Sequence, residues 1–148
     1  MAYIEFNRQS NRLKDFDYSS NQLYYITIGS YQMQCIFGKI ENNIMIKSPI
    51  GEIIDTEWKL INTNDNIETY DYVLMPNHLH GIIQILNHQM PLGEVIRRFK
   101  ARCSRKSDFI LWHRNYYEHI IRDDADYNRI AQYIANNPLK WNEDEYKI

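Results

Sequence analysis

The chain has 148 residues, and its 17 Lys and Arg against 19 Asp and Glu give a formal net charge of −2 at pH 7. This length predicts one domain, residues 1–148, with a core that needs no disulfide or structural metal. The two isolated cysteines exclude a disulfide framework and a cysteine-rich zinc motif. No apolar run reaches membrane-spanning length, and the charged N-terminal segment is unlike a signal peptide. We therefore expect a cytoplasmic protein with no membrane partner.

The first half of the chain predicts strands around one helix. Residues 22–30 are rich in Tyr, Ile and Thr and predict a strand, and residues 34–40 predict a short pairing strand that Gly38 ends. Ser48 and Pro49 open a helix, because apolar residues then recur at helical spacing from residue 50 to residue 61. A polar loop follows at 62–66.

The second half predicts a tight strand pair, a helix, a strand and a last helix. A strand runs to residue 75, a Pro-Asn turn follows, and residues 78–86 form the outgoing strand. Pro91 begins a helix with the apolar stripe Leu92, Val95, Ile96, Phe99 and Cys103. A strand is expected at 116–121, then a helix capped by Asp123 or Asp124 and ended by Pro138. The order predicts an α+β fold, a ferredoxin-like βαββαβ antiparallel sheet with an added C-terminal helix.

The helix that begins at Pro91 carries an uneven share of the charge. Its stripe leaves most cations on the solvent side, and the segment from residue 97 to residue 106 contains no acidic side chain. Cations beside exposed aromatic rings favour binding to unpaired nucleic-acid bases. The predicted DNA-binding residues are Arg97, Arg98, Lys100, Arg102, Arg105 and Lys106.

Two histidines two residues apart start the outgoing strand of the pair. His78 and His80 project from one face of a strand, where two imidazoles could hold one metal ion. Ile82 and Gln84 share that face, while Leu79, Ile83 and Ile85 form the opposite, core side, and Gly81 allows close backbone approach. Spacing alone leaves a structural and a metal-binding role equally open. For His88, His113 and His119 we expect surface or core roles.

The last helix presents one tyrosine on its apolar stripe and one beside it. Tyr127, Ile130, Ala131 and Ile134 share the stripe and predict core positions. Tyr133 lies on the flank of the stripe, with Asn137 one turn later on nearly the same side. From periodicity alone, a half-buried aromatic at the helix edge is the favoured interpretation of Tyr133.

Two motifs in this chain resemble a known family. Residues 72–81 (YVLMPNHLHG) are similar to an "MPNH-hydrophobic-H" segment, and residues 133–138 (YIANNP) to a "Y-I-x-x-N-P" helix end. Segments 92–100 and 117–122 are similar too, so the likeness covers about residues 20 to 140. The family is that of the REP-associated tyrosine transposases, within the single-tyrosine HUH transposases.

The resemblance implies metal-dependent cleavage and joining of single-stranded DNA through a covalent phosphotyrosine, on hairpin-forming repeats. It implies Tyr133 as nucleophile, His78 and His80 as metal ligands, and Asn137 as the third ligand. Two imidazoles and an amide oxygen suit Mn²⁺ and tolerate Mg²⁺. The broader family completes its site with a partner subunit, whereas the REP-associated type resembles a self-contained monomer, so monomer and homodimer both stay open.

Two other classes compete with this interpretation. A noncatalytic module that binds single-stranded nucleic acid would use the same sheet, aromatics and basic helix, but it leaves the paired histidines and residues 133–137 unexplained. A histidine-triad nucleotide hydrolase would need a further histidine where this chain has Ile82. Replication initiators and relaxases share the HUH chemistry but resemble larger chains.

Overall fold

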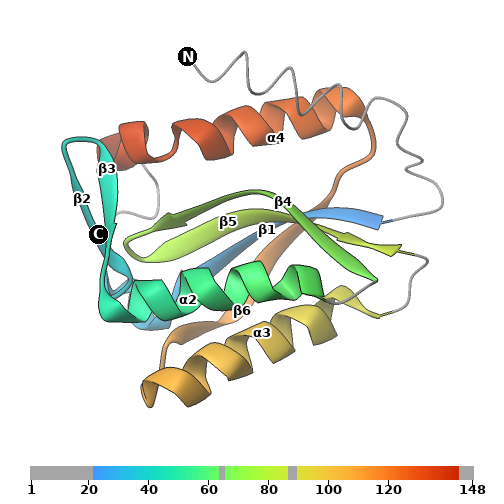
Figure 1. The fold of residues 1–148 in the computed structure, drawn as a ribbon. Helices are drawn as coiled ribbons and strands as arrows, with labels where there is room; N and C mark the ends of the chain where they lie inside the picture. Colours follow the sequence, from blue (N-terminus) through green and yellow to red (C-terminus); the bar gives the residue numbers. More distant parts are fainter. Residues whose placement is uncertain (1–21, 64–65, 87–89, 144–148) are drawn as a thin grey trace.

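The protein forms a twisted antiparallel sheet with helices on both faces (Figure 1). The computed structural model describes residues 22–63, 66–86 and 90–143. Its elements in chain order are β1 (Gln22–Ser30), η1 (Tyr31–Met33), β2 (Gly38–Glu41), β3 (Ile44–Lys47), α2 (Pro49–Leu60), η2 (Ile61–Thr63), β4 (Ile67–Met75), β5 (His78–Ile85), α3 (Leu92–Ser107), β6 (Trp112–Ile120), α4 (Asp124–Asn136) and η4 (Pro138–Glu143).

The sheet topology confirms the predicted fold class. The four strands of the main sheet lie in the order β4-β5-β1-β6, and each neighbouring pair is antiparallel. Helices α2 and α3 lie against one face and the added helix α4 lies against the other (Figure 1). This is the ferredoxin-like βαββαβ arrangement, in which β4 and β5 form the hairpin. Among the described residues, no helix is long and apolar enough to cross a membrane.

The predicted strand at 34–40 is wrong in its bounds and in its partner. The strand β2 starts at Gly38 instead of ending there, and it pairs with β3 in a separate two-stranded hairpin. Gly38 has a φ of 156°, which favours glycine, and Asn42 and Asn43 have φ values of 52° and 64° in the hairpin turn. Such positive φ angles at both central residues give a turn whose twist matches that of the strands. The hairpin therefore forms locally and does not extend the main sheet.

The last strand is longer than predicted, since β6 begins at Trp112 and not at residue 116. The helix predictions are closer to the structure. Ser48 caps α2, because its side chain accepts a hydrogen bond from the Gly51 N–H. In the same way Asp123 accepts from the Asp126 N–H and caps α4. The apolar stripe of α3 is buried throughout, as its spacing predicted.

The strand β5 is buried at all eight residues, so it has core on both faces. Leu79, Ile83 and Ile85 lie in the larger core beneath α2 and α3. Ile82 lies in a second core beneath α4, together with Tyr127. The expectation that only one side of this strand is core is therefore wrong, because α4 covers the histidine face as well.

Gly81 brings β5 close to α2, as the sequence predicted. A Cβ atom at this position would lie 2.5 Å from two ring carbons of Trp58. The Trp58 ring has little room to move, because it stacks on Tyr72 at 4.8 Å and meets Phe99 edge-on at 5.6 Å between ring centroids.

Replacing Gly81 with Ala should therefore overpack this core and lower the free energy of unfolding by about 1–3 kcal/mol. Gly93→Ala is the matched control, since the nearest atom to its Cβ would be the Tyr116 hydroxyl oxygen, at an ordinary 3.7 Å. It should be neutral or slightly stabilising. Urea unfolding followed by tryptophan fluorescence measures both. Equal stability of the two variants would contradict the close-packing argument.

Candidate active site

The two histidines of the motif lie together on the α4 face of the sheet. The turn at residues 76–77 places His78 at the first position of β5, and strand geometry directs His80 to the same face. The side chains are 0% and 1% exposed, and their ring centroids are 4.6 Å apart. Buried imidazoles need hydrogen-bond partners, so what holds each ring decides what it can do.

Asn77 orients the His78 ring. The Asn77 Nδ2 donates to the Met33 carbonyl oxygen at 3.1 Å, which turns Oδ1 toward His78 Nδ1 at 2.8 Å. Because an amide oxygen only accepts, His78 Nδ1 carries the proton in this assignment. The ring then presents the lone pair of Nε2, which is the form that binds a metal. The acceptor carbonyl belongs to a residue with a positive φ of 55°, so this contact also ties a tight loop to the site.

His80 is held by two hydroxyl groups of β1. Thr27 Oγ1 lies 2.8 Å and Tyr25 OH 2.9 Å from His80 Nδ1. The register explains the contact, since Thr27 is the direct partner of His80 in the β1–β5 ladder. The Tyr25 ring also stacks on His80, at 5.8 Å between centroids. A hydroxyl oxygen can accept the Nδ1 proton and leave Nε2 as the coordinating nitrogen here too.

Tyr133 reaches this site, whereas Tyr127 does not. The Tyr133 side chain is 44% exposed, and its ring meets His80 at 5.2 Å between centroids. Tyr127 is fully buried, as predicted, and its hydroxyl donates to Asp71 Oδ1 at 2.7 Å. The two tyrosines of α4 therefore differ in access as well as in position, and the more exposed one lies beside the histidines.

Asn137 lies where α4 ends above the histidine pair. It keeps helical backbone angles, φ −59° and ψ −47°, although Pro138 follows it. Its Nδ2 donates to the Tyr133 carbonyl at 3.1 Å, and its buried Oδ1 makes no hydrogen bond among the described residues. Four residues to either side, Tyr133 contacts His80 and Trp141 stacks on His78 at 6.4 Å. Asn137 is thus on the segment that spans both rings.

The donor set fits a divalent metal ion. It consists of the two imidazoles, His78 and His80, with the amide oxygen of Asn137 as a third neutral donor. Within the described ranges, no group of three or more His, Cys, Asp or Glu could hold a metal. A mixed nitrogen and oxygen set with few protein ligands leaves coordination positions for phosphate oxygens and water, which suits Mn²⁺ and tolerates Mg²⁺.

A cavity of about 440 Å³ opens beside Tyr133 and His80. Its walls come from β1, β5, β6 and α4, and Tyr117 and Arg129 are among the lining residues. Sequence patterns alone predicted no role for Asn77, Thr27, Tyr25, Tyr117 or Trp141. Asn77 stood inside the recognised motif, so its position was a usable signal. The other four become visible only through strand register or through the chain path after α4.

Among the other histidines, His119 belongs to an ion-paired network at the start of α4. His119 Nε2 and Asp126 Oδ2 are 2.7 Å apart, and Asp126 also pairs with Arg129. This network fastens the start of α4 to β6. His113 is exposed, and His88 lies outside the described residues.

The predicted DNA-binding cations lie on the other side of the sheet, on α3. Hydrogen bonds from Arg97 and Arg98 lower the pKa of the half-buried Glu94 to about 2. Burial opposes ionisation of Glu57, but hydrogen bonds from Lys106 and Arg102 outweigh it and hold its pKa below the ordinary value. Each carboxylate thus carries two cations, which leaves a net positive charge on the helix.

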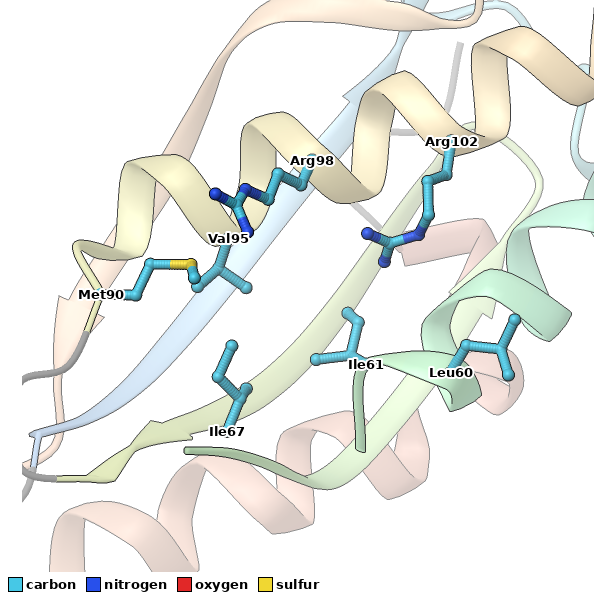
Figure 2. A pocket seen from close by; sticks show the side chains of 7 residues that line it. All are labelled: Leu60, Ile61, Ile67, Met90, Val95, Arg98 and Arg102. Atoms are coloured by element: carbon cyan, nitrogen blue, oxygen red, sulfur yellow. The ribbon is translucent and has the colours of Figure 1, made fainter. Parts of the chain in front are cut away.

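The other two cations of the cluster differ in environment. Lys100 donates to the His113 carbonyl at 2.9 Å, and burial lowers its pKa, whereas Arg105 is exposed. Figure 2 shows Arg98 and Arg102 above a cavity of about 330 Å³ with aliphatic walls. All six predicted DNA-binding cations lie on α3, and the structure does not bring them together with Tyr133 and the histidines.

Comparisons with known proteins agree with the motifs. No protein-family model matches the chain. An uncharacterized protein of Haemophilus influenzae is 37% identical over 96% of this chain and 94% of its own length. A second protein of that organism, named "Putative REP-associated tyrosine transposase", is 27% identical over 49% of this chain and 50% of its own length.

Two solved structures share the fold. One is a REP-associated tyrosine transposase bound to a REP hairpin, with a TM-score of 0.67 and 17% identity, covering 81% of this chain and 68% of that chain. The other is a "putative transposase" from Deinococcus radiodurans R1, with a TM-score of 0.55 and 16% identity over 78% of this chain and 90% of that one. The resemblance inferred from the two motifs is confirmed.

Asn77 offers a test of the donor set. Asn77→Ala removes the acceptor of the His78 Nδ1 proton and should weaken Mn²⁺ binding about 10- to 100-fold. Asn77→Asp keeps an acceptor oxygen and should retain most of the affinity. The control is Asn62→Ala, which removes an amide that accepts from the Thr69 N–H away from the site. Calorimetric titration with Mn²⁺, after circular dichroism confirms folding, compares the three. Unchanged affinity in Asn77→Ala would contradict the orienting role.

Proposed function

The chain belongs to one family with the 37% identical protein of Haemophilus influenzae, and it resembles the REP-associated tyrosine transposases. We therefore propose that it nicks and rejoins single-stranded DNA. The proposed activity depends on Mg²⁺ or Mn²⁺ and proceeds through a covalent phosphotyrosine. One observation carries the proposal. The exposed ring of Tyr133 lies beside His80, one of two buried and hydrogen-bonded imidazoles on the same strand.

Each residue of the site has a separate task in this proposal. His78 and His80 hold the cation through Nε2, and Asn137 supplies an amide oxygen. A bound divalent ion would withdraw charge from the scissile phosphate. Asn77, Thr27 and Tyr25 keep the imidazoles in place through their Nδ1 atoms.

Tyr133 is the proposed nucleophile. Its hydroxyl forms a bond to phosphorus, its proton leaves, and the displaced deoxyribose oxygen takes up a proton. A tyrosine hydroxyl has an ordinary pKa of about 10, so attack requires proton removal and a polarised phosphate. The phosphotyrosine conserves the phosphodiester energy, so that a later attack by a DNA hydroxyl rejoins the strand without ATP.

The substrate we propose is hairpin-forming repeat DNA. The solved relative is a complex with a REP hairpin, and the motifs of this chain match the same family. The unpaired part of such a substrate would give Tyr133 access to its phosphate. A noncatalytic single-strand-binding module remains the competing function, and the adduct experiment separates the two.

Tyr133→Phe removes one oxygen and should abolish the covalent protein–DNA adduct while folding and DNA binding stay nearly intact. Tyr127→Phe is the control, because that hydroxyl is buried against Asp71 and should not react. The experiment incubates each chain with Mn²⁺ and hairpin-bearing single-stranded DNA, followed by denaturing electrophoresis and peptide mapping. An adduct on Tyr127, or full cleavage by Tyr133→Phe, would refute the assignment. No adduct from the unmodified chain on any hairpin would favour the binding module.

A mixing experiment tests whether one chain completes its own site. Tyr133 and His80 already meet within a single chain, which supports a self-contained monomer. Equal amounts of Tyr133→Phe and a His78→Ala/His80→Ala double variant should therefore show no cleavage. Recovery of about a quarter to a half of the activity would mean that a homodimer shares its nucleophile between subunits.

The cations of α3 are proposed to contact DNA phosphates beyond the cleavage site. A plot of log affinity against log salt concentration has a negative slope, and each lost contact should reduce the magnitude of this slope by about 0.7 for a single strand. Arg97→Gln with Arg105→Gln should thus change it measurably, while Lys39→Gln on the β2–β3 hairpin should not. Fluorescence anisotropy at several salt concentrations provides the slopes. Equal slopes in all variants would show that the cluster is an ordinary solvated helix face.

A further inference from the structure

The cavity beside Tyr133 contains side chains that the proposed cleavage chemistry does not use. Tyr117 and Arg129 line it, yet neither belongs to the histidine pair or its hydrogen-bond partners. Its volume of about 440 Å³ falls within the range of small-molecule sites, which is about 300–1,000 Å³. The cavity is therefore large enough for one nucleotide and opens directly at the proposed nucleophile.

Strand register places an exposed aromatic ring in line with the site. Tyr117 on β6 pairs with Thr27 on β1, and Thr27 pairs with His80 on β5. Directly opposed residues share one face of a sheet, so Tyr117, Thr27 and His80 form a row across three strands. The Tyr117 side chain is 53% exposed, and Tyr25 meets it edge-on at 6.0 Å between ring centroids. This leaves the Tyr117 ring accessible to a planar group.

A guanidinium from a different element also lines the cavity. Arg129 projects from α4, and its side chain is 69% exposed. It pairs with Asp126, whose other carboxylate oxygen is held by His119. Arginine is well suited to phosphate, since its planar donors match the phosphate oxygens. The lining of the cavity thus offers an aromatic ring for stacking, from β6, and a cation, from α4.

We propose that this cavity binds one unpaired nucleotide directly adjacent to the phosphate that Tyr133 attacks. Its base stacks on Tyr117, and its outer phosphate lies at Arg129. The inference rests on the proposed function and identifies the part of the DNA substrate that this site reads. The basic helix α3 lies on the opposite sheet face and contacts other nucleotides.

The test uses a series of hairpin-bearing strands, each with a single 2-aminopurine at a different position. The fluorescence of each strand is measured with the Tyr133→Phe chain, which is expected to bind without cleaving. Quenching should peak at the nucleotide next to the phosphate that the unmodified chain cleaves. Tyr117→Ala should abolish that quenching and weaken binding about 5- to 140-fold, since base–aromatic stacking contributes about 1–3 kcal/mol per base. Tyr117→Phe keeps the ring and should restore both signals.

Two further variants locate the effect. Phe109→Ala removes another exposed aromatic, outside the cavity, and should bind DNA like the parent chain. Arg129→Gln should reduce the magnitude of the slope of log affinity against log salt by about 0.7, and the quenched base should stay at the same position.

The outcomes separate the subsite from the chemistry. Equal losses in Tyr117→Ala and Phe109→Ala, or a quenching maximum several nucleotides from the cleaved phosphate, would overturn the subsite. Absence of single-strand binding by every chain would overturn it as well. If the unmodified chain binds and quenches through Tyr117 but forms no phosphotyrosine, the proposed cleavage function fails while the nucleotide site stands.

Discussion

The burial of β5 on both faces is the constraint on which the site depends. One face packs closely against the Trp58 ring, and this is possible because Gly81 has no side chain. The other face carries two imidazoles under α4, where an unsatisfied polar group is costly. Each ring is therefore held at Nδ1, one by Asn77 and the other by β1 hydroxyls. The hydrogen bonds that stabilise buried histidines also direct their Nε2 atoms.

One side of helix α4 packs in the core, and another side faces the cavity at Tyr133. Its stripe from Tyr127 to Ile134 closes the second core, and this fixes the rotation of the helix. Tyr133 lies off that stripe, at the open cavity, and Asn137 one turn later is buried against the carbonyl of Tyr133. The chain then continues as η4, which places Trp141 on His78. Packing of the apolar side thus sets the orientation of Tyr133, the proposed nucleophile.

The sheet separates the cations of α3 from the candidate site at Tyr133 and the histidine pair, which lies on the opposite face. Four cations of α3 pair with two carboxylates, Glu57 and Glu94, and two of these cations, Arg98 and Arg102, line the cavity of Figure 2. The cavity at Tyr133 has its own cation, Arg129, from α4. A DNA strand that touches both faces must pass around an edge of the sheet. In the proposed function, substrate positioning and substrate cleavage would accordingly depend on different elements.

The sequence alone determined the order of the main-sheet strands and of the three long helices, because apolar periodicity and caps such as Ser48 and Asp123 are local signals. It did not predict the strand β3. The resemblance of two short motifs also indicated Tyr133, the histidine pair and Asn137 as candidate site residues, since the residues of each motif are close together in the chain. Tertiary structure alone decided that Thr27 faces His80 and that Tyr117 continues the row, because register joins residues more than 30 positions apart. It likewise decided that α3 lies away from the histidines, since helical periodicity identifies a buried side but not the sheet face against which that side packs.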